Sequence, residues 1–455
     1  MDNGINTSVF DIFKIGPGPS SSHTIGPMKA AGHFIACALQ LPAAELDKSD
    51  KIEVTLYGSL ASTGKGHGTD KAVLAGLLGQ KPETCDTDLL LGLLTKSGKT
   101  YKIALGRHKI NFCKENIIFD GKDHDFPYQN TLIIKLKSGR KVMLGKIYYS
   151  IGGGFIRGEG ESEPETRLPA FRYKNMAGLI RLTEKYDIPL IELLMKNESA
   201  VSGLSADEIS AKIDNLIAVM EDSVKRGIHT EGVLPGPIGL QRKAAAFYKR
   251  AVHMHQDVDR FLALLNAFSM AVSEENAAGH KIITAPTSGS AGVIPGIIYF
   301  LKNYHEVPQK LLREGLMVAA AVAFIARRNA SISGAEVGCQ GEIGVAASMA
   351  AAMISYVNGK SMDVIEAAAE IALEHHLGMT CDPVGGYVQI PCIERNAVGA
   401  VTAYNAYLLA SVGDPKKQKV NFDEVIEAML ETGKGMSREF KETSKGGLAV
   451  CSLCG

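Results

Sequence analysis

The sequence contains no tryptophan, few other aromatic residues and no excess of charge of either sign. Aromatic residues make up 6% of its 455 residues, and 49 Lys and Arg balance 49 Asp and Glu. Such a chain lacks the strongly basic surface that binding to nucleic acids or to anionic membranes requires. The composition therefore favours a small-molecule ligand, with no nucleic-acid partner and no membrane partner.

Long hydrophobic runs are absent as well. The most apolar segment, residues 317–326, stops at Arg327 and is much shorter than the ~20 residues of a membrane-spanning helix. We expect it to be a buried core helix. The first residues include early acids and no apolar stretch, which argues against a secretory signal peptide.

We therefore expect a cytoplasmic protein, and this affects the interpretation of its eight cysteines. In a reducing compartment, metal ligation or catalysis explains a cysteine pattern better than disulfide bonds do. Cys37, Cys85 and Cys113 have no distinctive sequence context, and we interpret them as structural or incidental.

Hydrophobic periodicity divides the chain into two parts. Alternating apolar residues at 52–56 and 132–136 predict strands, and the segment from Asp70 predicts a helix between them. Residues 1–155 should form an α/β domain with a small sheet, and the polar, proline-containing residues 156–172 should form a linker. Residues 173–455 should be mostly helical, with helices at about 205–226, 309–328, 342–357, 361–377 and 394–412. The predicted fold class is α+β with two domains.

Three cysteines of the helical part have unusual contexts. Cys339, Cys381 and Cys392 are flanked by glycine or proline and do not lie in the middle of helical patterns. Thiolates on turns can converge on one iron–sulfur unit whatever their sequence spacing. A small buried hydrophobic residue is the simpler explanation for any one of them. Three in similar contexts weaken that explanation without removing it.

The C-terminal sequence AVCSLCG adds Cys451 and Cys454 at CxxC spacing. This spacing suits a fourth ligand, but it suits zinc, a redox pair or a disordered tail equally well.

Two glycine-rich segments of the first domain each contain a histidine: His23 in GPGPSSSHT and His67 in TGKGH. Histidine suits a base that removes a proton from an amino-acid α-carbon, because its ordinary pKa lies near neutral pH. Residues 20–24 could equally cap the helix that follows, and His67 could be a solvated loop residue.

Three polar segments of the second domain could bind a zwitterionic ligand or could only cap and cross-link helices. Their candidate residues are Thr287 and Ser288 in TAPTSGSAG, Asn329, Ser331 and Ser333 in NASISGAE, and Glu394, Arg395 and Asn396 in CIERN. Spacing alone does not separate the two roles.

Nine motifs occur in one order along the chain: GPSSSHT, TGKGH, YYSIGGGF, TEGVLPGP, EENAAG, NASISGAEVGCQGE, TCDPVGG, PCIERNA and ETSKGGLAV. In this combination the sequence resembles the single-chain bacterial L-serine dehydratases, or L-serine deaminases, of the iron–sulfur type. The resemblance covers nearly the whole chain and is weakest at about residues 80–130.

The resemblance implies a lyase that converts L-serine to pyruvate and ammonia with a 4Fe-4S cluster and no pyridoxal phosphate. It implies a serine-binding type of N-terminal domain packed on a helical catalytic domain, and a homodimer. It assigns the cluster to Cys339, Cys381, Cys392 and a cysteine of the tail, and catalysis to His67 and His23. The expected substrate contacts are Ser20, Ser21, Ser22, Thr24, Thr287, Ser288, Asn329 and Ser333.

The tail departs from the family pattern. Family chains typically end on the tail cysteine, whereas here Gly455 follows Cys454 and Cys451 precedes it. We prefer Cys454 because of its distance from ETSKGGLAV, and Cys451 stays the alternative.

Three other functions deserve comparison. L-cysteine desulfidation could use a similar scaffold, but the SSSHT motif favours serine. Dehydration with pyridoxal phosphate could use SIGGGF as a phosphate loop, yet no Ser-x-Lys motif accompanies it. A non-catalytic serine-binding or oxygen-sensing protein is the third possibility, and the glycine-rich loops around the cysteines favour an accessible site instead.

Overall fold

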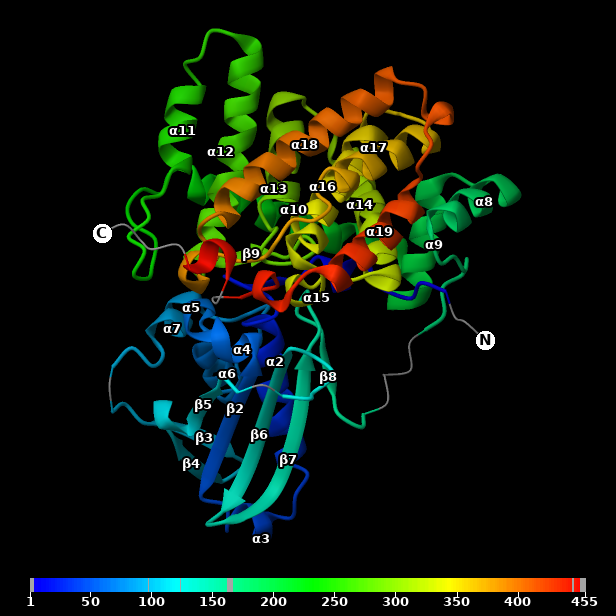
Figure 1. Cartoon of the computed structure of the whole chain (residues 1–455). Helices are drawn as coiled ribbons and strands as arrows, with labels where there is room; N and C mark the ends of the chain where they lie inside the picture. The colour runs from blue at the N-terminus through cyan, green and yellow to red at the C-terminus, as the bar shows by residue number, and fades with distance from the viewer. Residues whose placement is uncertain (1–3, 97, 123, 162–166, 444–445, 451–455) are drawn as a thin grey trace.

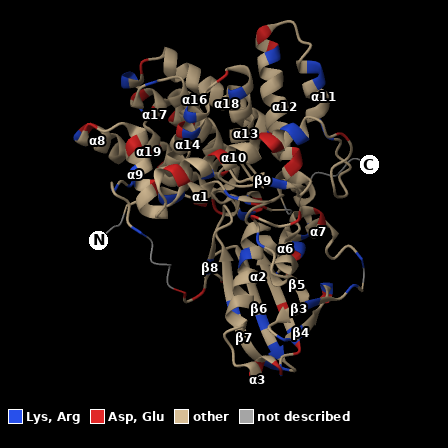
Figure 2. Cartoon of the chain, turned by 180° about the vertical axis from the view of Figure 1, so that it is seen from behind, with Lys and Arg blue, Asp and Glu red and all other residues tan. Residues whose placement is uncertain are grey.

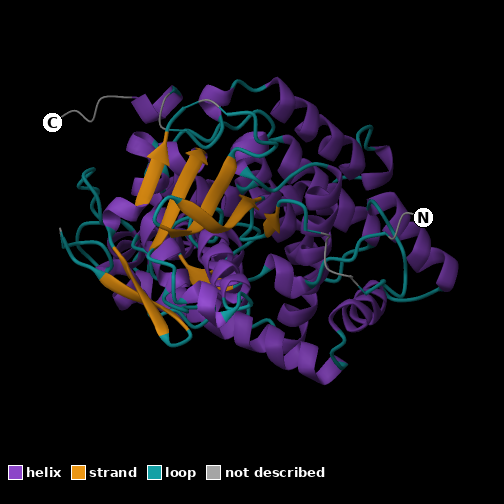
Figure 3. Cartoon of the chain, turned by 90° about the horizontal axis from the view of Figure 1, so that it is seen from below, coloured by secondary structure: helices purple, strands orange, loops and turns teal. Residues whose placement is uncertain are grey.

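The structure is a computed structural model that describes residues 4–96, 98–122, 124–161, 167–443 and 446–450. A half that contains the main sheet lies below a larger helical half (Figure 1). Seen from below, the strands lie in front of the helices that form most of the molecule (Figure 3). The predicted α+β fold with two parts is confirmed.

The main sheet has five strands in the order β5-β2-β6-β7-β8. They are β2 (Lys51–Gly58), β5 (Ile117–Asp120), β6 (Asn130–Ser138), β7 (Lys141–Ser150) and β8 (Ile156–Gly158). Strands β2 and β5 are parallel, and the other pairs are antiparallel. The apolar residues at 52–56 pair with those at 132–136 and are fully buried, so the alternation predicted both strands correctly.

Helices α2 (Ile25–Ala38) and α6 (Thr69–Leu77) share the hydrophobic core of this sheet. They begin two residues after His23 and His67 respectively, so each histidine lies just before the first turn of one of these helices. The smaller elements of the first half are α3 (Ala43–Leu46), α4 (Ser59–Ser62), α5 (Gly64–His67), α7 (Thr87–Gly92), the hairpin of β3 (Tyr101–Leu105) and β4 (His108–Phe112), and η1 (Lys114–Asn116).

The first residues of the chain pack with the helical half. Helix α1 (Val9–Ile12) lies in the helical core together with Ile5 and Phe13. Strand β1 (Ile15–Pro17) then pairs antiparallel with β9 (Lys281–Ile283). Residues before β1 therefore contribute to the helical core, although the sequence prediction grouped them with the sheet.

The helical half is built around α16 (Ile343–Val357), whose alanine-rich and glycine-rich sequence is buried almost throughout. Small side chains allow close approach of α14 (Gln309–Asn329), α17 (Met362–Glu374) and α18 (Cys392–Val412), which all contact α16. The remaining elements are α8 (Met176–Tyr186), α9 (Leu190–Ser202), α10 (Ala206–Gly227), α11 (Ala244–Ala251), α12 (Asp257–Ala277), α13 (Val293–Tyr304), α15 (Gly334–Val337), α19 (Phe422–Gly435), η2 (Gly338–Gly341), η3 (Val384–Gly386), η4 (Pro415–Lys417), η5 (Arg438–Phe440) and η6 (Gly447–Val450).

The five helices predicted in this half are confirmed, with ends that differ by at most a few residues. Residues 317–326 are buried inside α14, as expected. In the part of the chain that the structure describes, no single helix combines the length and hydropathy needed to cross a membrane. Helix α14 and residues 334–341 meet the length and hydropathy criteria only when taken together, and this pair is bent.

The end of the described chain returns to the boundary between the halves. We call residues 438–443 and 446–450 the C-terminal strap, which is the red segment above α5 in Figure 1. Along the elements seen from behind, basic and acidic residues are interspersed, in line with the balanced composition (Figure 2).

The contact between α2 and α6 yields a first prediction, because it carries both histidine segments. A Cβ atom on Gly76 would lie 2.2 Å from the carbonyl oxygen of Met28, so Gly76→Ala must push the helices apart. We expect the free energy of unfolding to fall by about 1–3 kcal/mol in denaturant titrations. Gly92→Ala is the control, because a Cβ there meets nothing within 4 Å. Equal stability of the two variants would contradict this account of the packing.

Candidate active site

The three cysteines with unusual sequence contexts meet in the helical half. Cys339 lies in η2, Cys381 follows α17 in a loop, and Cys392 is the first residue of α18. All three side chains are buried and line one small cavity. The Sγ atoms of Cys339 and Cys381 each lie 3.8 Å from Oε2 of Glu342.

Glycine allows the chain to pass close to these sulfur atoms. Gly338 has φ +75°, and a Cβ there would come within 2.6 Å of the Met379 carbonyl oxygen. A Cβ on Gly334 would lie 3.2 Å from the Cys381 Sγ. The glycine residues of NASISGAEVGCQGE therefore serve a steric purpose beside the cysteines.

The electrostatics of this group suit a bound cation. Burial, followed by the nearby charges of Cys339 and Glu442, raises the pKa of Glu342 well above its usual value. Burial likewise raises the pKa of Cys392. A hydrogen bond with Cys381 lowers the pKa of Cys339, and the same contact raises the pKa of Cys381. Arg395, whose Nη1 donates to the Thr380 carbonyl oxygen at 2.7 Å, also lines the cavity.

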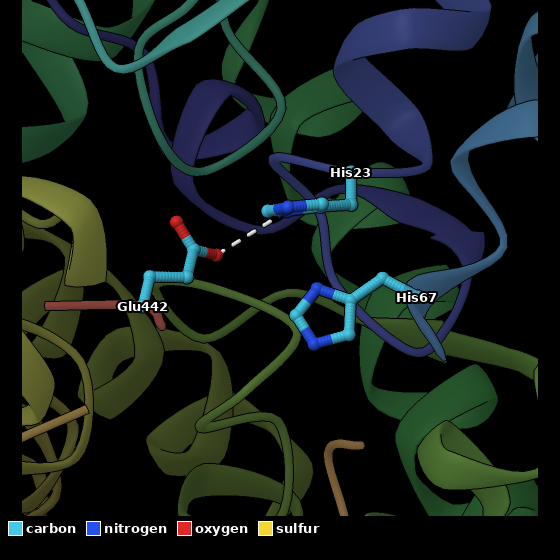
Figure 4. A group of neighbouring side chains, drawn as sticks. All are labelled: His23, His67 and Glu442. Carbon is cyan, nitrogen blue, oxygen red and sulfur yellow. Dashed lines mark ion pairs between the residues drawn. The ribbon is translucent and has the colours of Figure 1, made fainter. Parts of the chain in front are cut away.

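His23, His67 and Glu442 form a second group, brought together from three segments of the chain (Figure 4). Nδ1 of His23 lies 3.3 Å from Oε1 of Glu442. The two imidazole rings meet edge to face, with their centroids 4.4 Å apart. All three side chains are buried.

His67 is unusual because its buried ring makes no hydrogen bond of ordinary geometry with the described residues, although the Gly386 backbone lies close to it. Neither ring nitrogen has a partner among the described residues, and the side chain is 2% exposed. Burial, and then the charge of His23, lowers the pKa of His67 to about 3, against smaller upward effects of Glu442 and the Gly386 backbone. The ring is therefore neutral at pH 7 with a lone pair available. Such an unsatisfied polar group costs stability and is a candidate for a functional role.

Glu442 is surrounded by hydrogen-bond donors from the first half. Ser22 Oγ donates to Oε1 at 2.9 Å, and Asn130 Nδ2 donates to Oε2 at 3.2 Å. Burial alone would raise the pKa of Glu442, but the charge and hydrogen bond of His23, with smaller contributions from His67 and Asn130, lower it to about 2.

The side-chain atoms of this second group lie within 4.8 Å of one another, which is close enough to share a metal ion. His23 and Glu442 already have protein partners for their polar atoms, however. The group is therefore a hydrogen-bonded network, whereas the cysteine group presents the soft sulfur ligands that iron and zinc prefer.

The two groups open onto the same cavity at the boundary between the halves. Ser20 and His67 line it from the first half, the three cysteines with Glu342 and Arg395 line it from the second half, and Glu442 lines it from the strap. A neutral histidine, three cysteines and several charged side chains thus share one buried space.

Comparison with known proteins identifies the family of the chain. The family model of the serine dehydratase beta chain matches residues 8–161, and that of the serine dehydratase alpha chain matches residues 185–449. The chain belongs to the L-serine dehydratase family of ammonia-lyases.

Curated relatives match this family member along nearly their whole length. The chain is 42% identical to an L-serine dehydratase of Haemophilus influenzae over 98% of this chain and 99% of the relative. It is 44% identical to L-serine dehydratase 2 of Escherichia coli over 97% and 98%, respectively. An L-serine dehydratase of Streptomyces coelicolor is 42% identical over the same shares.

Several residues expected to contact substrate in this family lie at or beside the cavity. Ser20 lines it, and Ser22 lies between His23 and Glu442. Thr287 Oγ1 donates to Oε1 of Glu342 at 2.6 Å. Ser21 Oγ accepts a hydrogen bond from the Ser288 amide, while the buried Ser288 Oγ lacks a partner among the described residues. Of these residues Ser20 lines the cavity itself, and Ser22 and Thr287 contact the lining residues Glu442 and Glu342.

Other expected contacts point elsewhere. Thr24 immediately precedes α2 at the N-cap position, but its hydroxyl donates to the carbonyl oxygens of Pro17 and Ser20 and does not cap the helix. Asn329 donates to the Lys174 carbonyl oxygen, away from the cavity. Ser333 precedes α15 and packs near Gly152. Cys451 and Cys454 lie outside the described residues.

Two acidic residues that line this cavity were not singled out from the sequence. Glu342 lies three positions after Cys339 in GCQGE, and Glu442 begins the ETSKGGLAV motif. Both belong to motifs that carried the resemblance. Proximity to the candidate ligand Cys339 was an available signal for Glu342, whereas no candidate ligand adjoins Glu442 in the sequence.

Proposed function

We propose that the chain converts L-serine to pyruvate and ammonia at this interdomain cavity. The observation that supports it most is the convergence of three cysteines from the helical half with the unpartnered His67 of the first half. The relatives named L-serine dehydratase support serine as the substrate.

We further propose a 4Fe-4S cluster held by Cys339, Cys381 and Cys392, with a tail cysteine as a displaceable fourth ligand. The three buried thiols around one cavity fit such a group, because clusters are bound by cysteine thiolates and buried thiols of raised pKa need a cation to ionise. When bound, an iron without a permanent cysteine ligand supplies a Lewis acid that activates the β-hydroxyl for departure and makes the α-proton more acidic.

The residues of the chain have separate tasks in this proposal. His67 takes the α-proton of serine, since its ring is neutral and faces the cavity. Arg395 is placed to attract the substrate carboxylate, and the hydroxyl groups of Ser20 and Thr287 are placed to orient the substrate. Loss of the α-proton and the β-hydroxyl yields aminoacrylate, which becomes an imine and is hydrolysed to pyruvate and ammonia.

An anaerobic assay of the purified chain tests the function. We expect pyruvate and ammonia in equal amounts from L-serine, without added pyridoxal phosphate and without inhibition by borohydride. Sulfide release from L-cysteine at a higher kcat/KM would identify the desulfidase alternative. Binding of serine without turnover would identify the sensory alternative. We also propose a homodimer in the cytoplasm, which sedimentation and cell fractionation can examine.

The tail prediction concerns residues outside the described part of the chain. In the proposed arrangement a tail cysteine occupies the iron that serine must reach, so serine displaces it before turnover. Cys454→Ser should keep the iron content, make the cluster more sensitive to oxygen and shorten the lag before steady turnover. Absorbance decay in air and progress curves would measure both effects. Cys451→Ser is the matched control, and a defect confined to that variant would reverse the assignment.

A further inference from the structure

The strap carries one carboxylate into the first half of the molecule. Ser22, Asn130 and His23 all contact the side chain of Glu442, and Ser59 Oγ donates to its carbonyl oxygen at 2.8 Å. These partners precede Glu442 by more than 300 positions, so the contact exists only when strap and first half are assembled.

The same strap holds the loop of a proposed cluster ligand. The Cys381 amide donates to the Phe440 carbonyl oxygen at 2.7 Å, and the Thr443 amide donates to the Cys381 carbonyl oxygen at 3.2 Å. The Leu448 amide adds a hydrogen bond to Asp382 Oδ2 at 2.8 Å. The segment around Glu442 is therefore fixed to the cysteine loop on one side and to His23 on the other.

We propose that Glu442 is a positioning residue that orients His23 and, through it, His67. This inference rests on the proposed function, because it assigns a role in the chemistry of His67. The two histidines therefore reach an active arrangement only when the strap is packed in place and brings the Glu442 carboxylate to His23.

The contacts of His23 show how the carboxylate holds its ring. Nε2 of His23 lies 2.8 Å from Thr63 Oγ1 and 3.2 Å from the Ser59 carbonyl oxygen. On the other side, Nδ1 lies 3.0 Å from Ser22 Oγ and 3.3 Å from Oε1 of Glu442, and the Ser22 hydroxyl donates to the same Oε1 atom. The Glu442 carboxylate therefore fixes the Nδ1 edge of the ring both directly and through Ser22.

His67 depends on this arrangement because the His23 ring packs directly against it, while the Gly386 backbone is a weaker polar neighbour. Its nitrogen atoms have no partners among the described residues, and its edge-to-face contact with His23 is the ring contact that orients it. A rotation of His23 would therefore change the direction of the His67 lone pair without any change at the cysteines.

A neutral isostere cannot replace the carboxylate. The side-chain amide of glutamine has one acceptor oxygen and one NH₂ donor in place of the two acceptor oxygens of glutamate. In one orientation the NH₂ group faces the donor Nδ2 of Asn130, and in the other it faces Ser22 Oγ, which donates to the carboxylate, and the neighbouring His23 ring. Aspartate keeps both acceptor oxygens and the charge, although it is shorter by one methylene group.

The test compares Glu442→Gln and Glu442→Asp with Glu439→Gln, which removes an exposed carboxylate of the same strap. We expect Glu442→Gln to lower kcat by about 10²-fold with KM changed by less than about threefold, and Glu442→Asp to stay within about tenfold of wild type. Glu439→Gln should match wild type. The iron content should stay normal in all three. A milder effect of Gln than of Asp would overturn the proposal, since a merely structural link tolerates the isostere better.

Hydrogen–deuterium exchange provides a readout that does not depend on turnover. Glu442→Gln should accelerate exchange at residues 20–26 and at residues 438–443 together by about tenfold, whereas Glu439→Gln should not. Unchanged exchange at residues 20–26 would overturn the link between Glu442 and His23. A wild-type chain that forms no pyruvate would refute the proposed function, and the exchange comparison would still decide whether Glu442 orders the His23 segment.

Discussion

Replacement of Cys339, Cys381 or Cys392 by serine is expected to remove most of the bound iron and to lower pyruvate formation from L-serine by at least about 10³-fold. The three thiols line one buried cavity, so each replacement leaves the proposed cluster with two protein ligands from the helical half. Serine is a hard oxygen ligand with a much higher pKa than cysteine, and it does not substitute for a thiolate on iron. Iron analysis should find about four irons per chain in the wild type and few in each variant.

Cys85→Ser is the matched control, because Cys85 is also buried but lies in the core of the first half. It should keep its iron and its activity, apart from a modest loss of stability. If all three variants of the cavity cysteines kept their colour and their activity, the proposal of a metal site would be wrong. The cysteines would then be packing residues.

Local sequence patterns predicted most of the fold. Alternation at 52–56 and 132–136 specified two paired strands, because side chains of a strand alternate between its faces. Helical spacing located α10, α14, α16, α17 and α18 to within a few residues. The position of α1 could not be found in this way, because Val9 and Ile12 gain their burial from the helical half, far along the chain.

The candidate site was partly accessible to the same reasoning. Glycine and proline beside the three cysteines indicated turns that could converge, and the structure places these cysteines on one cavity. The partners of Glu442 are separated from it by more than 300 residues, and no local pattern reports such a contact. The motif of Asn329 suggested a substrate contact, and its amide donates to the Lys174 carbonyl oxygen, so that role stays a prediction.

His67→Ala should lower kcat by at least about 10³-fold while the iron content and the visible absorbance stay normal, because a general base acts in the chemical step and does not hold the metal. The stability of a second variant separates this role from a structural one. Two buried nitrogens without partners cost about 1–3 kcal/mol each, so His67→Phe, which fills the space without polar atoms, should be at least as stable as the wild type. His375→Ala is the control, because that ring is largely exposed on the helical half. Loss of activity together with a gain in stability is the signature of a residue kept for chemistry, whereas wild-type kinetics in His67→Ala would move the base to His23.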